Sequence, residues 1–247
     1  VTKRLSIDHQ SLKKVNPKII TCSISGFGDT EVNRPAYDNL IQGYAGAMSI
    51  TGTDKENPVK SGIPIADLGA GLYAVIGILS AIQSREKNDS GEHVDISMLD
   101  TQVSLLTYMA TMHFLSGENP EPIGNQHMNH VPFNSYRTSD GFIQIGVVAE
   151  DFWPSLIEAL NLRKLDTEEN KVRSGRLKNR ENIDQAVQEV FITNTTQHWL
   201  KTLQEHRVPC GPINTLSETF QDADLLKRNM IVEVLQESGA SVKMPGN

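Results

Sequence analysis

Asp67 is the residue of this chain that is best placed to do chemistry. It stands at the start of a long apolar run and is followed by two glycines, in the segment Ile63-Pro64-Ile65-Ala66-Asp67-Leu68-Gly69-Ala70-Gly71-Leu72. An aspartate in front of an apolar run can be the N-cap of a helix, where its side-chain oxygen accepts backbone N–H groups. In a dry pocket the same carboxylate can attack an activated acyl group. The residues alone leave both roles open.

The stretch that Asp67 precedes predicts a helix. Residues 68–82 are apolar on nearly every side, a pattern that indicates a buried helix. Gly69 and Gly71 each cost a helix about 1 kcal/mol relative to alanine. Glycines in such places are expected where another backbone or a ligand comes close. They shift the balance toward a functional Asp67 without deciding it.

Two other groups of side chains could carry chemistry. His127 and His130, with Asn129 between them, lie in a loop-like segment at a spacing that would suit two metal ligands. No third ligand with a matching pattern is near, so a polar loop lining a pocket, or a solvated surface, is favoured and no metal is expected. Cys210 has no base that the sequence can assign to it, which favours a packed thiol over a nucleophile. No serine lies in a Gly-x-Ser-x-Gly elbow, which disfavours a serine hydrolase.

Composition bounds the class of protein. The chain has 247 residues, enough for one large domain or two modest ones. Its net charge is −7. The acidic balance argues against a nucleic-acid partner. No uninterrupted apolar run reaches the roughly 20 residues of a membrane helix, so no membrane partner is expected. Two cysteines, Cys22 and Cys210, offer neither a disulfide framework nor a zinc spacing and suit a reducing compartment.

The elements that must position Asp67 alternate between helix and strand. Apolar periodicity predicts helices over residues 7–15, 37–48, 68–82 and 99–115 and strands over residues 18–25 and 91–98. The first strand runs into Gly26-Phe27-Gly28, a common feature of the ligand side of α/β sheets that here lacks a dinucleotide fingerprint. This alternation predicts an α/β fold with some parallel pairing.

The second half has a different pattern. Residues 118–122 have the composition of a linker. A hairpin is expected over residues 133–138 and 141–148, across Ser139-Asp140-Gly141. Helices are expected over residues 150–161, 180–192 and 196–206, then a rigid turn over residues 208–214 and a short helix. A final strand is expected over residues 230–235, so this half is predicted to be α+β.

Six motifs occur in one order along the chain. They are Ser23-Ile24-Ser25-Gly26-Phe27-Gly28, Ala36-Tyr37-Asp38, Ser49-Ile50-Thr51-Gly52, the segment around Asp67, Gly91-Glu92-His93-Val94-Asp95-Ile96-Ser97-Met98-Leu99-Asp100 and Val208-Pro209-Cys210-Gly211-Pro212-Ile213-Asn214. Each is weak alone, but their order resembles the family III CoA-transferases, which include formyl-CoA transferase, carnitine CoA-transferase and the dicarboxylate CoA-transferases. The resemblance runs from about Leu5 to Asn247.

The resemblance implies that CoA moves from an acyl-CoA donor to a free carboxylic acid, with a dicarboxylate such as succinate as one candidate. In this family an aspartate at the position of Asp67 forms a mixed anhydride and then a thioester with CoA. The family's CoA contacts map onto Pro35, Ala36, Tyr37 and Asp38. Coenzyme A, as acyl-CoA, is therefore the expected cofactor.

Two alternatives on the same fold remain. In α-methylacyl-CoA racemases a histidine takes the place of Tyr37 and exchanges a proton with the aspartate. A tyrosine, with a pKa of about 10, is a poor two-way proton partner at neutral pH, which favours the transferase. The other alternative is a non-catalytic relative that binds acyl-CoA.

One segment departs from the family pattern. Formyl-CoA transferase has a glycine-rich loop where this chain has His127-Met128-Asn129-His130, without a glycine. Formyl or oxalyl specificity is therefore not expected. His127, Asn129 and His130 are instead predicted to hold the distal carboxylate of a larger acid.

The resemblance also predicts the organisation of the chain. Family members have an N-terminal nucleotide-binding half and a C-terminal end that we expect this chain to lack. The expected fold is a partial family III fold: a Rossmann-like portion of a large α/β domain carrying Asp67 (residues 1–117), a small α+β domain (118–229) and the start of a return to the large domain (230–247). The isolated chain is expected to be inactive, and the full-length protein to form an interlocked homodimer. The sequence does not fix the cellular compartment. The protein is expected in the cytoplasm if it is bacterial, and a mitochondrial location is an alternative if it is eukaryotic.

Overall fold

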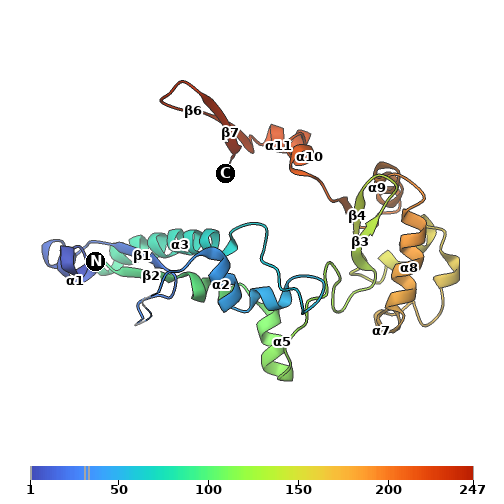
Figure 1. Cartoon of the computed structure of the whole chain (residues 1–247), viewed down its shortest axis with the longest axis horizontal. Coiled ribbons are helices and arrows are strands. Elements are labelled where there is room, and N and C mark those ends of the chain that lie inside the picture. Colours follow the sequence, from blue (N-terminus) through green and yellow to red (C-terminus); the bar gives the residue numbers. More distant parts are fainter. Residues whose placement is uncertain (1, 31, 33, 247) are drawn as a thin grey trace. The chain divides into compact units, whose positions relative to one another are not determined.

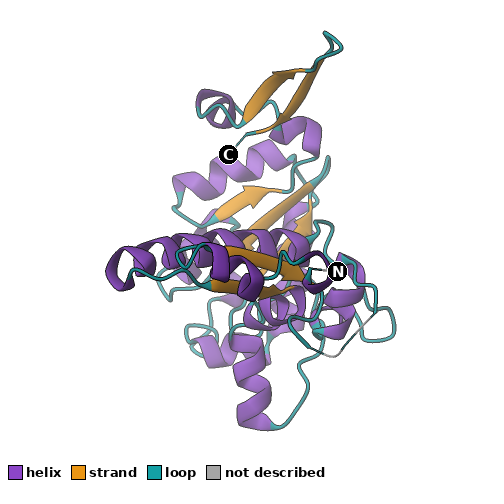
Figure 2. Cartoon of the chain, turned by 90° about the vertical axis from the view of Figure 1, so that its left-hand side faces the viewer, coloured by secondary structure: helices purple, strands orange, loops and turns teal. Residues whose placement is uncertain are grey.

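The computed structural model describes residues 2–30, 32 and 34–246 (Figure 1). The chain forms two compact units, Val1–Gly124 and Asn125–Asn247. The division expected at residues 117, 229 and 247 stays a prediction. The structure is mixed, with helices and strands in both units (Figure 2), as the sequence predicts.

The first unit is built around a pair of parallel strands. It contains a short 3-10 helix (Lys3–Leu5), α1 (His9–Val15), β1 (Thr21–Ser25), α2 (Asp38–Tyr44), a second 3-10 helix (Ala47–Ile50), α3 (Ile65–Asn88), β2 (His93–Ser97), α4 (Met98–Ser104) and α5 (Tyr108–Ser116). β1 and β2 pair in parallel, with Thr21 opposite His93 and Ser25 opposite Ser97. The predicted parallel pairing is therefore confirmed.

Helix α3 lies along β1 and β2 (Figure 1) and packs closely on them because it has small residues on that side. A Cβ at Gly77 would lie 2.5 Å from Val94 Cγ1 in β2, and one at Gly69 would lie 3.0 Å from Thr101 Cγ2 in α4. The predicted burial of α3 is wrong within this chain. Its larger apolar side chains project away from these contacts, and Leu72 remains 67% exposed.

α3 also bears on the expectation about membranes. In the described part of the chain it is the one helix long and apolar enough to cross a membrane by length and composition. Its 24 residues include Asp67 and the glycines, which is why no uninterrupted apolar run was seen in the sequence. Core helices of soluble proteins pass the same test, so a single such helix is weak evidence.

The helix expected over residues 99–115 is in fact two. α4 begins at Met98, where the side chain of Ser97 accepts the Asp100 N–H at 3.1 Å, and it ends at Ser104. α5 begins after Thr107, whose φ of 49° is rare for a β-branched residue. The chain therefore turns between two helices that apolar periodicity had joined.

The second unit has an antiparallel sheet covered by helices. β3 (Phe133–Arg137), β4 (Phe142–Gly146) and β5 (Cys210–Pro212) pair in that order. The helices are α6 (Phe152–Ala159), a 3-10 helix (Arg163–Leu165), α7 (Arg173–Lys178), α8 (Arg180–Phe191) and α9 (Thr196–Glu205). The predicted hairpin is confirmed, but the expected rigid turn over residues 208–214 contains the edge strand β5.

The core of this unit joins the sheet to α6, α8 and α9. Ile143 and Ile145 of β4, Leu156 of α6, Phe191 of α8 and Leu203 of α9 are all almost fully buried. Each such side chain contributes about 1.5–3 kcal/mol when it leaves water. Trp153 of α6, which is 1% exposed, belongs to the same core.

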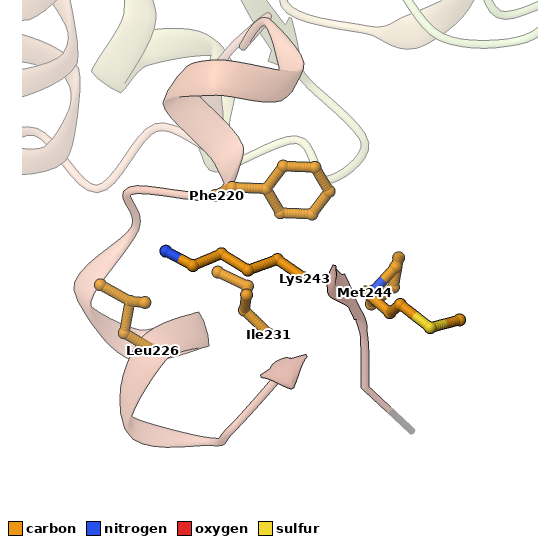
Figure 3. A pocket seen from close by; sticks show the side chains of 6 residues that line it. Phe220, Leu226, Ile231, Lys243 and Met244 are labelled. Carbon is orange, nitrogen blue, oxygen red and sulfur yellow. The ribbon is translucent and has the colours of Figure 1, made fainter. Parts of the chain in front are cut away.

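The last segment contains two short helices and a hairpin. α10 (Leu216–Thr219) and α11 (Ala223–Lys227) precede β6 (Ile231–Leu235) and β7 (Ser241–Pro245), so β6 is not the final strand. A cavity of about 250 Å³ lies among them, lined by Phe220, Leu226, Ile231, Lys243, Met244 and Pro245 (Figure 3). None of the residues expected to do chemistry lines it.

Candidate active site

Asp67 lies in the first turn of α3, as the third helical residue. The predicted N-cap role is wrong, because the helix begins at Ile65 and Pro64 occupies the N-cap position without a side-chain cap. The carboxylate of Asp67 is exposed and accepts no hydrogen bond from a described residue. A negative charge in the first turn is still favourably placed, since the N-terminal end of a helix carries partial positive charge.

The cap of α3 comes from Asp38, the first residue of α2. Asp38 Oδ1 accepts the backbone N–H of Ala66 at 2.8 Å and that of Asp67 at 3.4 Å. Asp38 Oδ2 accepts an N–H from Gln42 Nε2 at 2.6 Å, and Gln42 Oε1 accepts the Ser61 N–H at 2.8 Å. Since Gln42 is 2% exposed, this network fixes the start of α3 from inside the unit.

The same network brings the expected CoA-binding residues to the helix that carries Asp67. Ala36 packs on the small core of Ile41, Ala66, Ala70 and Met98 that joins α2, α3 and α4. Pro35 is exposed, and Tyr37, which precedes α2, is 67% exposed. The structure thus places Asp38 and Asp67 together, with Tyr37 free to contact a ligand.

The glycine loop after β1 lies against this segment. A Cβ at Gly26 would approach the Ala36 Cβ to 2.1 Å, so only glycine fits at this contact. The loop is held by two side chains: Ser25 Oγ accepts the Gly28 N–H at 3.0 Å, and Asp95 Oδ2 accepts the Asp29 N–H at 2.9 Å. The glycine at the end of this strand therefore serves here to admit the methyl group of Ala36.

The expected ligand role of the two helix glycines divides between them. Gly69 faces α4 and is needed for close helix packing, whereas a Cβ at Gly71 would meet no atom within 4 Å. Of the two, Gly71 alone leaves open space beside α3. The sequence predicted that another backbone or a ligand comes close to these glycines. At Gly69 the close neighbour is the packed helix α4.

The polar loop of residues 127–130 belongs to the second unit. His127 Nδ1 accepts the Asn129 N–H at 3.0 Å, and the His127 and His130 rings are 4.7 Å apart. Burial, followed by the neighbouring positive charges of His127, Arg173 and Arg176, lowers the pKa of His130. Asn129 is exposed, and His130 Nδ1 is buried without a partner among the described residues.

No metal centre is formed by the described residues: no group of three or more His, Cys, Asp or Glu side chains is arranged to hold an ion. Cys22 is exposed, and Cys210 is partly buried in β5. Burial raises the pKa of the Cys210 thiol, which is the opposite of what an activated nucleophile needs.

Several residues near these candidates were not found from sequence. Gln42 could have been suspected because it stands one helical turn after Asp38 and can share its face. Arg34 lies over the rings of Phe27 and Tyr44, at 4.5 and 4.3 Å from their centroids, a double cation–π contact beside the expected CoA segment. Nothing in the sequence pointed to the contacts that Arg176 and Arg180 make with residues 127–131.

The first unit thus presents an exposed carboxylate, that of Asp67, in the first turn of a helix packed on a parallel strand pair. The chain belongs to CoA-transferase family III, whose model matches residues 1–247. It is 31% identical to a succinate–glutarate CoA-transferase of Agrobacterium fabrum, over 97% of this chain and 60% of that protein. It is 32% identical to a succinyl-CoA:mesaconate CoA-transferase of Haloarcula marismortui, over 98% of this chain and 62% of the relative.

Solved structures agree with the fold. A CAIB/BAIF family protein from Brucella suis superimposes with a TM-score of 0.82 at 33% identity, over 94% of this chain and 62% of that one. A Mycobacterium tuberculosis protein superimposes with a TM-score of 0.86 at 19% identity, which supports the fold alone. The chain spans about 60% of the length of these relatives.

Proposed function

We propose that this chain is part of an enzyme that transfers CoA from an acyl-CoA donor to a dicarboxylic acid, with Asp67 as the nucleophile. The observation that carries the proposal is the division of roles at the start of α3. Asp38 caps the helix through Ala66 N–H and Asp67 N–H, which leaves the exposed carboxylate of Asp67 without a hydrogen bond to a described residue. A capping carboxylate would be occupied; Asp67 is free to attack.

The reaction proceeds in four displacements. An Asp67 oxygen attacks the thioester carbonyl carbon and the C–S bond breaks. CoA thiolate is released, and the acyl group stays on Asp67 as an aspartyl-acyl anhydride. The thiolate attacks the Asp67 carbonyl carbon, giving a thioester between Asp67 and CoA and releasing the donor acid. The acceptor carboxylate attacks this thioester to form a second anhydride, and the thiolate then takes the acceptor acyl group and restores Asp67. Water must be excluded throughout, because it would hydrolyse each intermediate.

Pro35, Ala36, Tyr37 and Asp38 are proposed to contact CoA. Their support is their position: Asp38 lies at the helix start that carries Asp67, and Tyr37 and Pro35 are exposed beside it. Asp38 has both oxygens engaged by the protein, so in this proposal it acts mainly by placing its neighbours.

His127, Asn129 and His130 are proposed to receive the second carboxylate of the acceptor. The support is chemical, since ring and amide N–H groups donate to carboxylates and the loop lacks the glycines of a formyl-specific loop. The names of two relatives also contain dicarboxylate substrates, succinate with glutarate and succinyl-CoA with mesaconate. A homodimer of the full-length protein remains part of the proposal.

The test is intact mass spectrometry of the full-length protein with succinyl-CoA, beside Asp67→Ala. The expected result is a covalent increment, sensitive to hydroxylamine, that is lost in Asp67→Ala. An increment that survives the substitution would move the chemistry to another residue. Exchange of the α-proton of an acyl-CoA in deuterated water, without transfer, would favour the racemase alternative instead.

A further inference from the structure

The polar loop of the second unit is held at both ends by arginines four residues apart. Arg176, in α7, donates from Nε to the Val131 carbonyl at 2.9 Å. Arg180, the first residue of α8, donates from Nη2 to the His127 carbonyl at 2.7 Å. The loop conformation is therefore set from outside the loop, by the junction of α7 and α8.

The two arginines differ in how many hydrogen bonds they donate. Arg176 is 1% exposed and uses all its nitrogens: beside Val131 it donates to the carbonyls of Asn170 and Lys171 and, from Nη2, to Glu150 Oε2 at 2.7 Å. Its loss would leave several buried acceptors unpaired, so it serves the fold of the whole unit. Arg180 donates one hydrogen bond to the loop, and its Nη1 has no partner among the described residues.

The bond from Arg180 reaches the rest of the loop through His127. The centroid of the His127 ring lies 4.7 Å from that of His130 and 5.3 Å from that of Phe133, while His127 Nδ1 accepts the Asn129 N–H at 3.0 Å. A shift of the His127 backbone would move its ring, and with it the Asn129 backbone and the His130 contact. One hydrogen bond thus bears on the His127 ring, the Asn129 backbone and the His130 ring.

We infer that Arg180 is a positioning residue for acceptor selection, which it performs by holding the His127 carbonyl so that residues 127–130 are arranged to receive a second carboxylate. This inference rests on the proposed function, in which that loop receives the dicarboxylic acceptor. A hydrogen bond from a charged donor is worth about 10- to 100-fold in an equilibrium, so its loss is large enough to change selectivity.

The test is a competition between two acceptors of equal chain length that differ by one carboxylate, glutarate and pentanoate. The full-length protein receives one acyl-CoA donor and both acids at equal concentration. The ratio of the two products then reports only the ratio of kcat/KM for the acceptors, because the donor step is common to both. Three variants are compared with the wild type: Arg180→Met, Arg180→Lys and, as a matched control, Lys178→Met.

We expect Arg180→Met to lower the glutarate-to-pentanoate product ratio by about 10-fold. Arg180→Lys should recover most of the ratio, because a single N–H is enough for the His127 carbonyl. Lys178→Met removes the same charge from an exposed position at the α7–α8 junction and should keep the wild-type ratio.

The outcomes distinguish the role of Arg180 from the proposed function. An unchanged product ratio in Arg180→Met overturns the inference about Arg180. So does an equal loss of both products together with a lower melting temperature, since that is the signature of a purely structural residue. No transfer to either acid by the wild type overturns the proposed function, and no wild-type preference for glutarate overturns the role of the loop and the inference with it.

Discussion

The clearest test of the geometry at Asp67 is to remove the carboxylate that caps its helix. In Asp38→Ala the N–H groups of Ala66 and Asp67 lose their acceptor, which for an N-cap costs about 1 kcal/mol. The Nε2 of Gln42, a side chain that is 2% exposed, also loses its acceptor at a further cost of about 1–3 kcal/mol. The expected loss is therefore about 2–4 kcal/mol of unfolding free energy.

Asp38→Asn is the matched control. The asparagine side chain keeps an oxygen that can accept the Ala66 N–H. Its amide nitrogen, however, faces Gln42 Nε2, so that two donors meet where a carboxylate oxygen accepted before. Gln42 cannot rotate its amide to accept without losing the Ser61 N–H at 2.8 Å. We expect this variant to lose only the Gln42 part of the network, about 1–3 kcal/mol, and to leave the cap in place.

The assay is urea unfolding of the full-length protein in the absence of CoA, with hydrogen exchange read at the amides of Ala66 and Asp67. Exchange at both amides should rise in Asp38→Ala and stay low in Asp38→Asn. If Asp38 acted only as a CoA contact, the opposite result is expected: its loss would change the affinity for CoA but leave the stability and the amide exchange of the ligand-free protein unchanged. Wild-type stability and wild-type exchange in Asp38→Ala would therefore refute the capping argument.

Three further variants test other contacts. Gly71→Ala should stabilise the protein by up to about 1 kcal/mol, since a Cβ there meets no atom within 4 Å. Gly69→Ala gains the same helix propensity, but its Cβ would crowd Thr101 Cγ2 at 3.0 Å at a cost of about 1–3 kcal/mol, so it should be the less stable of the two variants, and equal melting temperatures would contradict this. In the second unit burial raises the pKa of Asp184, whose Oδ1 accepts the Tyr136 O–H at 2.5 Å. The folded state then binds more protons than the unfolded state, so stability falls as pH rises from about 4 through the raised pKa. Asp184→Asn should remove that fall, and a pH-independent difference in melting temperature between wild type and variant would show that Asp184 does not titrate in this range.

Much of the fold could be predicted because its signals are local. The hairpin of β3 and β4 follows from alternation on each side of Ser139-Asp140-Gly141, and the parallel pair of β1 and β2 follows from the alternation of strand and helix. β5 was missed because it has only three residues, one of them Pro212, and so shows no strand periodicity. The break between α4 and α5 was missed because Thr107 carries no sign of its positive φ.

The candidate site could be predicted only in part. Asp67 stood out through its apolar run and glycines, yet the cap came from Asp38, 29 residues earlier in the chain. Likewise Arg180 holds the carbonyl of His127 across 53 residues. Such contacts depend on how elements pack, and a side chain that bonds a distant backbone leaves no periodic trace in a sequence.

The cap by Asp38 also connects two parts of the proposed mechanism. Asp38 begins α2 and is contiguous with Tyr37, while its carboxylate holds the backbone of Asp67. The segment proposed to bind CoA and the helix that bears the proposed nucleophile are thus joined by hydrogen bonds of 2.8 and 3.4 Å rather than by a flexible loop. Such a connection limits how far the thioester and the attacking carboxylate can drift apart, and misplacement of reacting groups by about 1 Å can cost 100-fold in rate. In the proposed mechanism Asp38 therefore need not touch CoA to matter for catalysis, because it sets the position of Asp67, the proposed nucleophile.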